Sequence, residues 1–106
     1  PFTWEQIEAG MDALSAWLEA EGWKAPTEGT LQYLPLYARY HAQTYLENGR
    51  GQGSGLDRAD VLVLFAAFSA DAPQGEGTYV FWLIPDASGG WQVDDWGQTT
   101  FPDLAG

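Results

Sequence analysis

Residues 78–84 carry a large apolar side chain at every position after the first, and this segment constrains the fold more than any other feature of the sequence. Its β-branched and aromatic residues predict a strand. Because side chains alternate across a strand, one face would carry Tyr79, Phe81 and Leu83 and the other Val80, Trp82 and Ile84. Two helices can cover one face of a small sheet. The second face must then meet the tail at residues 101–104, enclose a cavity, or meet another subunit.

The first twenty residues predict a helix with a defined start and end. Thr3 and Gln6 have the spacing of a capping box. An apolar stripe follows at spacings of three and four residues, formed by Ile7, Met11, Leu14 and Leu18. Gly22 suits a left-handed C-cap, and Trp23 would supply the apolar contact that accompanies it. The helix should therefore end near residue 21.

A second helix is predicted over residues 34–47, where one helical face carries Leu34, Tyr37, Ala38, His41 and Tyr45. The glycine-rich loop 49–55 then divides the chain into a helical half, residues 1–48, and a mainly β half, residues 56–106.

The β half predicts strands at residues 61–69, 78–84 and 91–96, the last two joined by a turn. For residues 57–70 a helix is the alternative, because Asp57 and Asp60 could start one. We expect a single α+β domain over residues 1–106. In it, two N-terminal helices pack on a curved antiparallel β-meander of three or more strands.

Residues 86–96, DASGGWQVDDW, resemble the closing hairpin of the NTF2-like (cystatin-like α+β) superfamily. In that superfamily a turn rich in Asp and Gly precedes a Trp and an alternating strand. The order of helices before strands is also similar. The resemblance implies a curved sheet around an N-terminal helix, a conical apolar pocket and dimers through the outer sheet face. It implies no particular activity, because this fold hosts enzymes and pure binding modules alike.

The charge balance excludes several classes of function. Fifteen Asp and Glu residues against four Lys and Arg give a net charge of −11. Direct nucleic-acid binding needs clustered Lys and Arg and is not expected, and an anionic membrane surface is disfavoured for the same reason. The apolar run 61–68 is far shorter than the roughly 20 residues that span a bilayer, so we expect a cytoplasmic protein. With no Cys and one His, we expect neither a metal site nor a cofactor.

The surplus of aromatic residues predicts an apolar ligand pocket or a sheet face used for dimerisation. The residues expected to line the pocket are Tyr37, His41, Phe65, Phe81, Trp82 and Trp96.

Catalytic candidates are few. His41 could act as a general base if Asp94 or Asp95 oriented its ring. Asp94 and Asp95 are adjacent in a predicted strand, so only one of them could face a cavity. The alternative is a partly buried helix histidine bonded to a tyrosine hydroxyl or to solvent. We therefore expect a non-catalytic binding protein.

Four acidic residues form a stripe on the first predicted helix, at Glu5, Glu8, Asp12 and Glu19. A charged stripe of this kind is either a solvated surface or a site for a basic protein partner. The second reading predicts an acidic inhibitor or nucleic-acid mimic, of the anti-defence or immunity type, that occupies a basic groove on its partner.

Overall fold

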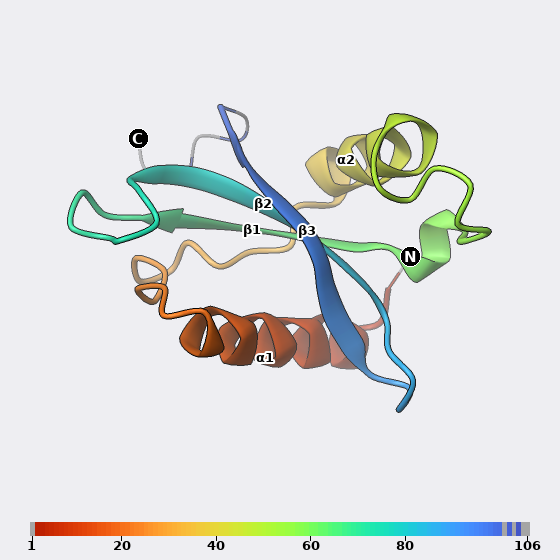
Figure 1. Cartoon of the computed structure of the whole chain (residues 1–106), viewed down its shortest axis with the longest axis horizontal. Helices are drawn as coiled ribbons and strands as arrows, with labels where there is room; N and C mark the ends of the chain where they lie inside the picture. Colours follow the sequence, from red (N-terminus) through yellow and green to blue (C-terminus); the bar gives the residue numbers. More distant parts are fainter. Residues whose placement is uncertain (1, 101, 103, 105–106) are drawn as a thin grey trace.

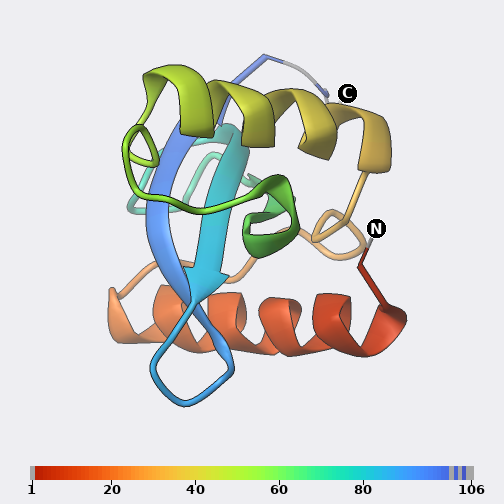
Figure 2. The ribbon, with the colours of Figure 1, turned by 90° about the vertical axis from the view of Figure 1, so that its right-hand side faces the viewer.

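One helix lies on each face of a three-stranded antiparallel sheet, as Figure 1 and Figure 2 show from two directions. The computed structural model describes residues 2–100, 102 and 104. In chain order its elements are α1 (Trp4–Ala20), α2 (Pro35–Asn48), a short 3-10 helix η1 (Arg58–Asp60), β1 (Leu62–Phe68), β2 (Gly77–Pro85) and β3 (Trp91–Thr99). The strand order is β1-β2-β3. The predicted α+β class, with helices before strands, is confirmed.

The ends of α1 are formed by the residues that the sequence indicates. The Thr3 side chain accepts a hydrogen bond from the backbone N–H of Gln6 at 3.1 Å, and the Gln6 side chain accepts one from the Thr3 N–H at 2.8 Å. At the other end Gly22 has a φ of 75°. The Trp23 N–H then reaches the Leu18 carbonyl at 2.9 Å, which is the bond of a Schellman motif. The helix therefore ends in a turn that directs Trp23 toward the sheet.

An apolar core lies between α1 and the sheet. α1 contributes Ile7, Leu14 and Leu18, and the strands contribute Leu62, Leu64, Ala66, Phe68, Tyr79, Phe81 and Leu83. Gly10 lets the helix approach closely, because a Cβ atom there would overlap the side chain of Leu62. This layer buries one face of β1 and β2.

The α2 side holds a second, separate core. It is made of Ala38, Ala42, Tyr45, Val61, Val63, Phe65 and Val80. The expectation that both helices share one face is therefore wrong. Both faces of β1 and β2 are apolar, so each needs its own helix, and the alanines of α2 let it lie close to the second face.

The link between the two helices covers the outer edge of β1. Gln32 pairs with Phe65 through two backbone hydrogen bonds of 2.9 and 3.0 Å. The Thr30 hydroxyl donates to the Ala67 carbonyl at 3.2 Å and accepts from the Ala67 N–H at 3.0 Å. Because this segment closes the edge and a helix covers each face, every residue of β1 is buried.

Residues 57–70 combine both of the structures considered for them. Asp57 and Asp60 form a capping box, as a helix start would require. The helix is only the three residues of η1, and Val61 is already extended with φ −119° and ψ 101°. The predicted strand then follows as β1. The eight consecutive apolar residues from 61 to 68 suit a strand buried on both faces better than an amphipathic helix.

Part of the C-terminal tail contributes to the α2-side core. Leu104 packs against that cluster, and its N–H donates to the Thr78 hydroxyl at 3.3 Å. Phe101 and Asp103, the other large or charged members of the predicted covering tail, lie outside the described residues.

Replacing Gly22 by Ala should lower the free energy of unfolding by about 1 kcal/mol, because an L side chain is strained at this positive φ. Gly97→Ala is the matched control, since a Cβ atom there meets nothing within 4 Å and its φ is not positive. Urea denaturation of both variants and the parent measures the difference. An equal change in the two variants would contradict the role given to Gly22.

Candidate functional site

Four of the six residues predicted to line a pocket lie on the α2 side. The ring centre of His41 is 5.5 Å from that of Phe65 and 6.1 Å from that of Trp82. Tyr37 lies 6.5 Å from Phe65, and the Trp82 indole N–H donates to the His41 carbonyl at 3.0 Å. These rings pack on one another and form the layer between α2 and the sheet.

The remaining two predicted pocket residues lie on the α1 side. Phe81 is fully buried. The ring of Trp96 packs edge to face against Trp23 at 4.8 Å, and Trp23 also contacts Phe68 and Tyr79. The sheet therefore separates Phe81 and Trp96 from the other four residues, and the structure does not bring the six together around one cavity.

Asp94 joins three parts of the chain. Its Oδ2 accepts a hydrogen bond from the Tyr45 hydroxyl at 2.6 Å and one from Arg50 Nε at 3.2 Å, and its Oδ1 accepts from Arg50 Nη2 at 3.3 Å. These bonds tie the end of α2 and the glycine-rich loop to β3. Gly51 lies against the ring of Tyr45, where a Cβ atom would overlap it. The glycine-rich loop is therefore anchored at its start.

The same contacts shift the pKa values of the two acids in the cluster. The hydrogen bonds from Arg50 lower the pKa of Asp94, with the Tyr45 hydroxyl acting in the same direction. Burial raises the pKa of Tyr45, and the hydrogen bond to Asp94 and its charge raise it further. At neutral pH the cluster therefore holds a carboxylate, a neutral phenol and a guanidinium.

A β-bulge in β3 changes the orientation predicted for the two adjacent aspartates. The register shifts between Trp82 and Leu83, and both Val93 and Trp96 pack on the α1 side. Strict alternation, which would send Asp94 and Asp95 to opposite faces, does not hold here. The Asp95 carboxylate accepts from the Trp96 N–H at 2.9 Å. The catalytic pair of His41 with one of these aspartates stays a prediction.

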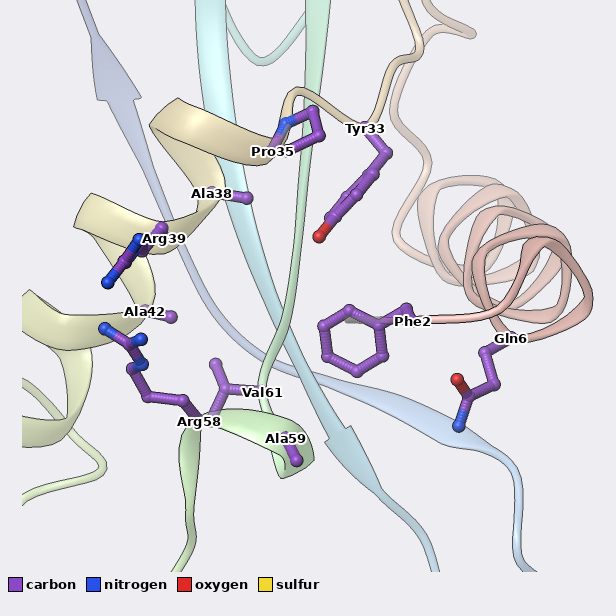
Figure 3. A pocket seen from close by; sticks show the side chains of 10 residues that line it. All are labelled: Phe2, Gln6, Tyr33, Pro35, Ala38, Arg39, Ala42, Arg58, Ala59 and Val61. Atoms are coloured by element: carbon purple, nitrogen blue, oxygen red, sulfur yellow. The ribbon is translucent and has the colours of Figure 1, made fainter.

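A hollow in the described surface lies elsewhere, beyond the outer edge of β1. It has a volume of about 460 Å³ and is lined by Phe2, Gln6, Tyr33, Pro35, Ala38, Arg39, Ala42, Arg58, Ala59 and Val61. Figure 3 shows these side chains converging from the start of α1, the helix link, α2 and η1. Ala38, Ala42 and Val61 are buried and give the pocket an apolar floor.

Two arginines line one end of this pocket. Arg39 from α2 and Arg58 from η1 both line it, and in the view of Figure 3 they appear at the same end. The other two basic residues of the chain form ion pairs, Lys24 with Asp71 at 2.6 Å and Arg50 with Asp94 at 3.2 Å. Within the described residues no carboxylate lies within ion-pair distance of Arg39 or Arg58. In a chain of net charge −11, the two basic side chains that have no acidic partner among the described residues therefore line the same pocket.

Uncharged polar groups also line the pocket. The Tyr33 hydroxyl points into the hollow, and the Gln6 amide lies beyond the ring of Phe2, on the side away from the arginines (Figure 3). The ring of Phe2 meets that of Tyr33 edge to face at 6.1 Å. Burial raises the pKa of Tyr33, so this phenol is neutral at physiological pH. Gln6 uses its Oε1 as an acceptor for the helix cap, which leaves its NH₂ group as a donor.

None of the pocket residues was among the candidates that the sequence suggested. The sequence does contain one signal for the arginines, because only four basic residues are present and each is therefore a candidate for binding an anion. Which of them form ion pairs depends on the tertiary structure, however. Arg50 and Arg58 flank the same glycine-rich loop, yet Arg50 bonds Asp94 and Arg58 reaches the pocket.

The predicted acidic stripe is exposed on α1. The buried residues of that helix face the sheet, and the stripe residues all face solvent: Glu5, Glu8, Asp12 and Glu19. Among the ion pairs of the described part of the chain, none involves these four carboxylates.

Comparison with protein-family models, with curated proteins and with solved structures finds no match to this chain. The NTF2-like resemblance therefore stays a prediction. Within residues 2–100, 102 and 104, no three His, Asp or Glu side chains are grouped so that they could hold a metal ion. Neither helix in that part of the chain is long and apolar enough to cross a membrane.

Asp94→Asn should lower the free energy of unfolding by about 2 kcal/mol at neutral pH, because it weakens charge-assisted hydrogen bonds. The pKa of Asp94 is lower in the folded protein than in the unfolded chain. The parent's advantage is therefore complete above about pH 4 and is lost as the pH falls through the folded-state pKa. Urea denaturation across this range should show the two proteins converging in acid.

Asp95→Asn is the matched control for this series. It removes the same charge from the neighbouring position, where the carboxylate accepts a bond from a backbone N–H and acts on Tyr45 and Arg50 through its charge alone. An equal loss of stability in both variants at neutral pH would contradict the anchoring role of Asp94.

Proposed function

We propose that this protein is a non-catalytic binding protein that holds a small organic anion in the pocket beside Arg39 and Arg58. The observation that carries the proposal is the pair of guanidinium groups lining this pocket without an acidic partner among the described residues. Like charges placed together repel each other, and a bound anion relieves that repulsion. Guanidinium groups also bind carboxylate and phosphate oxygens through paired hydrogen bonds.

The size and lining of the pocket also support binding. Its volume of about 460 Å³ falls in the range that holds small organic ligands, roughly 300–1,000 Å³. The lining combines six apolar residues with four that carry polar groups, and ligand sites likewise combine apolar surface with placed polar groups. This pocket lies beside β1 and not inside a curved sheet, so it differs from the conical pocket that the NTF2-like resemblance implies.

The chemistry of the lining favours binding over catalysis. The lining residues include no Asp, Glu, His, Ser or Cys, which are the usual nucleophiles and general bases. Tyr33 is the one weak acid among them, and burial raises its pKa further from neutrality. The two guanidinium groups supply positive charge and hydrogen-bond donors.

Arg39→Gln and Arg58→Gln should each weaken the binding of inorganic phosphate and of phenylacetate by about tenfold or more, which is the effect of one charge-assisted hydrogen bond. Isothermal titration calorimetry measures the affinity of each protein for both ligands. Lys24→Gln is the matched control, because it removes the same charge far from the pocket and should leave binding unchanged. Equal binding by all three variants, or no binding of either anion by the parent, would overturn the proposal.

A second proposed function rests on the exposed acidic stripe of α1. Its four carboxylates form no ion pair with a described residue, so their charge is free to attract a basic protein surface. Under this proposal the chain acts as an acidic inhibitor that occupies a basic groove.

Neutralising the stripe should weaken binding to poly-lysine, used as the basic probe, and should reduce the dependence of that binding on salt. The variant carries Glu5→Gln, Glu8→Gln, Asp12→Asn and Glu19→Gln. The control removes the same number of charges at scattered exposed positions, with Glu21→Gln, Glu28→Gln, Glu47→Gln and Glu76→Gln. If both variants lose binding equally, net charge alone is responsible and the stripe is not a specific site.

A further inference from the structure

We infer that the anion bound by this pocket is an aromatic carboxylate, with its carboxylate between Arg39 and Arg58 and its ring on the apolar floor. This inference rests on the proposed function and names the class of ligand. It follows from how charge, apolar surface and small side chains are distributed along the pocket.

The charged groups occupy one end of the pocket only. Arg39 and Arg58 lie together at that end, the rings of Phe2 and Tyr33 lie farther along, and Gln6 lies at the far side (Figure 3). An inorganic anion held by the arginines would leave most of the 460 Å³ empty. A ligand that fills the pocket therefore needs an apolar body joined to its anionic group.

The walls beside the arginines suit a flat body. Ala38, Ala42 and Ala59 line this part of the pocket, and their single methyl groups leave room where larger side chains would close it. The edge-to-face pair of Phe2 and Tyr33 bounds the space at its other side. Aromatic rings contact such pairs favourably in both edge-on and offset geometry. These surroundings favour an aromatic ring.

Net charge favours a carboxylate over a phosphate ester. The chain as a whole carries a charge of −11, and its repulsion of an approaching anion grows with the charge of that anion. A monoanionic carboxylate meets less of this repulsion than a dianionic phosphate ester. Two guanidinium groups are also enough to satisfy both carboxylate oxygens through paired hydrogen bonds.

Two uncharged polar groups define a further feature of the ligand. The Gln6 NH₂ group can donate a hydrogen bond, and the Tyr33 hydroxyl can donate or accept one. A hydroxyl on the ring would therefore have hydrogen-bond partners among the lining residues. We choose 4-hydroxyphenylacetate as the probe for these reasons.

The test is calorimetric titration of the parent protein with four probes: 4-hydroxyphenylacetate, its neutral amide, acetate and inorganic phosphate. We expect 4-hydroxyphenylacetate to bind about tenfold or more tightly than each of the others, since burying the ring and pairing the charge each contribute at least that factor. If acetate or phosphate binds as tightly, the ligand is not an aromatic carboxylate, but the proposal that the pocket binds an anion is still supported. If the neutral amide binds as tightly, the arginines do not select the ligand and the proposed function fails as well.

A variant that narrows the pocket tests the contribution of the ligand's ring to binding separately from that of its charge. Ala59 is exposed in η1, so Ala59→Leu adds bulk to the pocket and keeps both arginines. It should weaken the binding of 4-hydroxyphenylacetate by about tenfold, because the ring loses part of the apolar surface that it buries. It should leave the binding of phosphate unchanged. Ala9→Leu, on the exposed side of α1, is the control for added apolar surface.

Thermal unfolding followed by circular dichroism checks that each variant folds. Unchanged binding of 4-hydroxyphenylacetate by a folded Ala59→Leu protein would overturn the placement of the ring. Loss of phosphate binding in the same variant would show that the substitution disturbs the arginines. In that case Ala42→Val, which narrows the floor from α2, repeats the test from the opposite wall, and unchanged aromatic binding there overturns the placement.

Discussion

The structure depends on one constraint, which is that two of its three strands are apolar on both faces. β1 has no solvent-exposed residue, and β2 places Tyr79, Phe81 and Leu83 toward α1 and Val80 and Trp82 toward α2. A sheet of three strands cannot fold over to cover itself, so each face takes one helix. The link between the helices must then pass from one face to the other, and it does so along the edge of β1. The same segment that makes this crossing satisfies the backbone groups that the edge would otherwise expose.

This arrangement also creates the pocket. Since the two helices lie on opposite faces, they meet only beyond the edge of the sheet, where the start of α1, the helix link, α2 and η1 come together around Val61. Small side chains on α2 leave the space open, and the capped start of α1 fixes one wall. The cluster of Tyr45, Asp94 and Arg50 anchors the glycine-rich loop that leads into η1.

Local signals predicted the elements well. The capping box at Thr3 and the cap at Gly22 depend only on neighbouring residues, and each is present as predicted. The candidate site was predicted less well, because the aromatic residues chosen for it are the core itself. Apolar periodicity identifies side chains that need burial, but it does not distinguish those that pack on each other from those that line a cavity. The β-bulge in β3 likewise has no clear sequence pattern, and it changes which way Asp94 and Asp95 point.

The sequence by itself determined the class of the fold, the limits of both helices and the need to cover two faces of the sheet, since these follow from local backbone preferences and from the alternation of side chains. Only the tertiary structure decided that the helices lie on opposite faces and that a pocket opens beside β1. It also decided that Arg50 is paired while Arg39 and Arg58 share that pocket. Ion pairs and cavities depend on distances between residues far apart in the chain. Those distances are set by how the covered sheet and its connections pack, and the order of residues alone does not specify them.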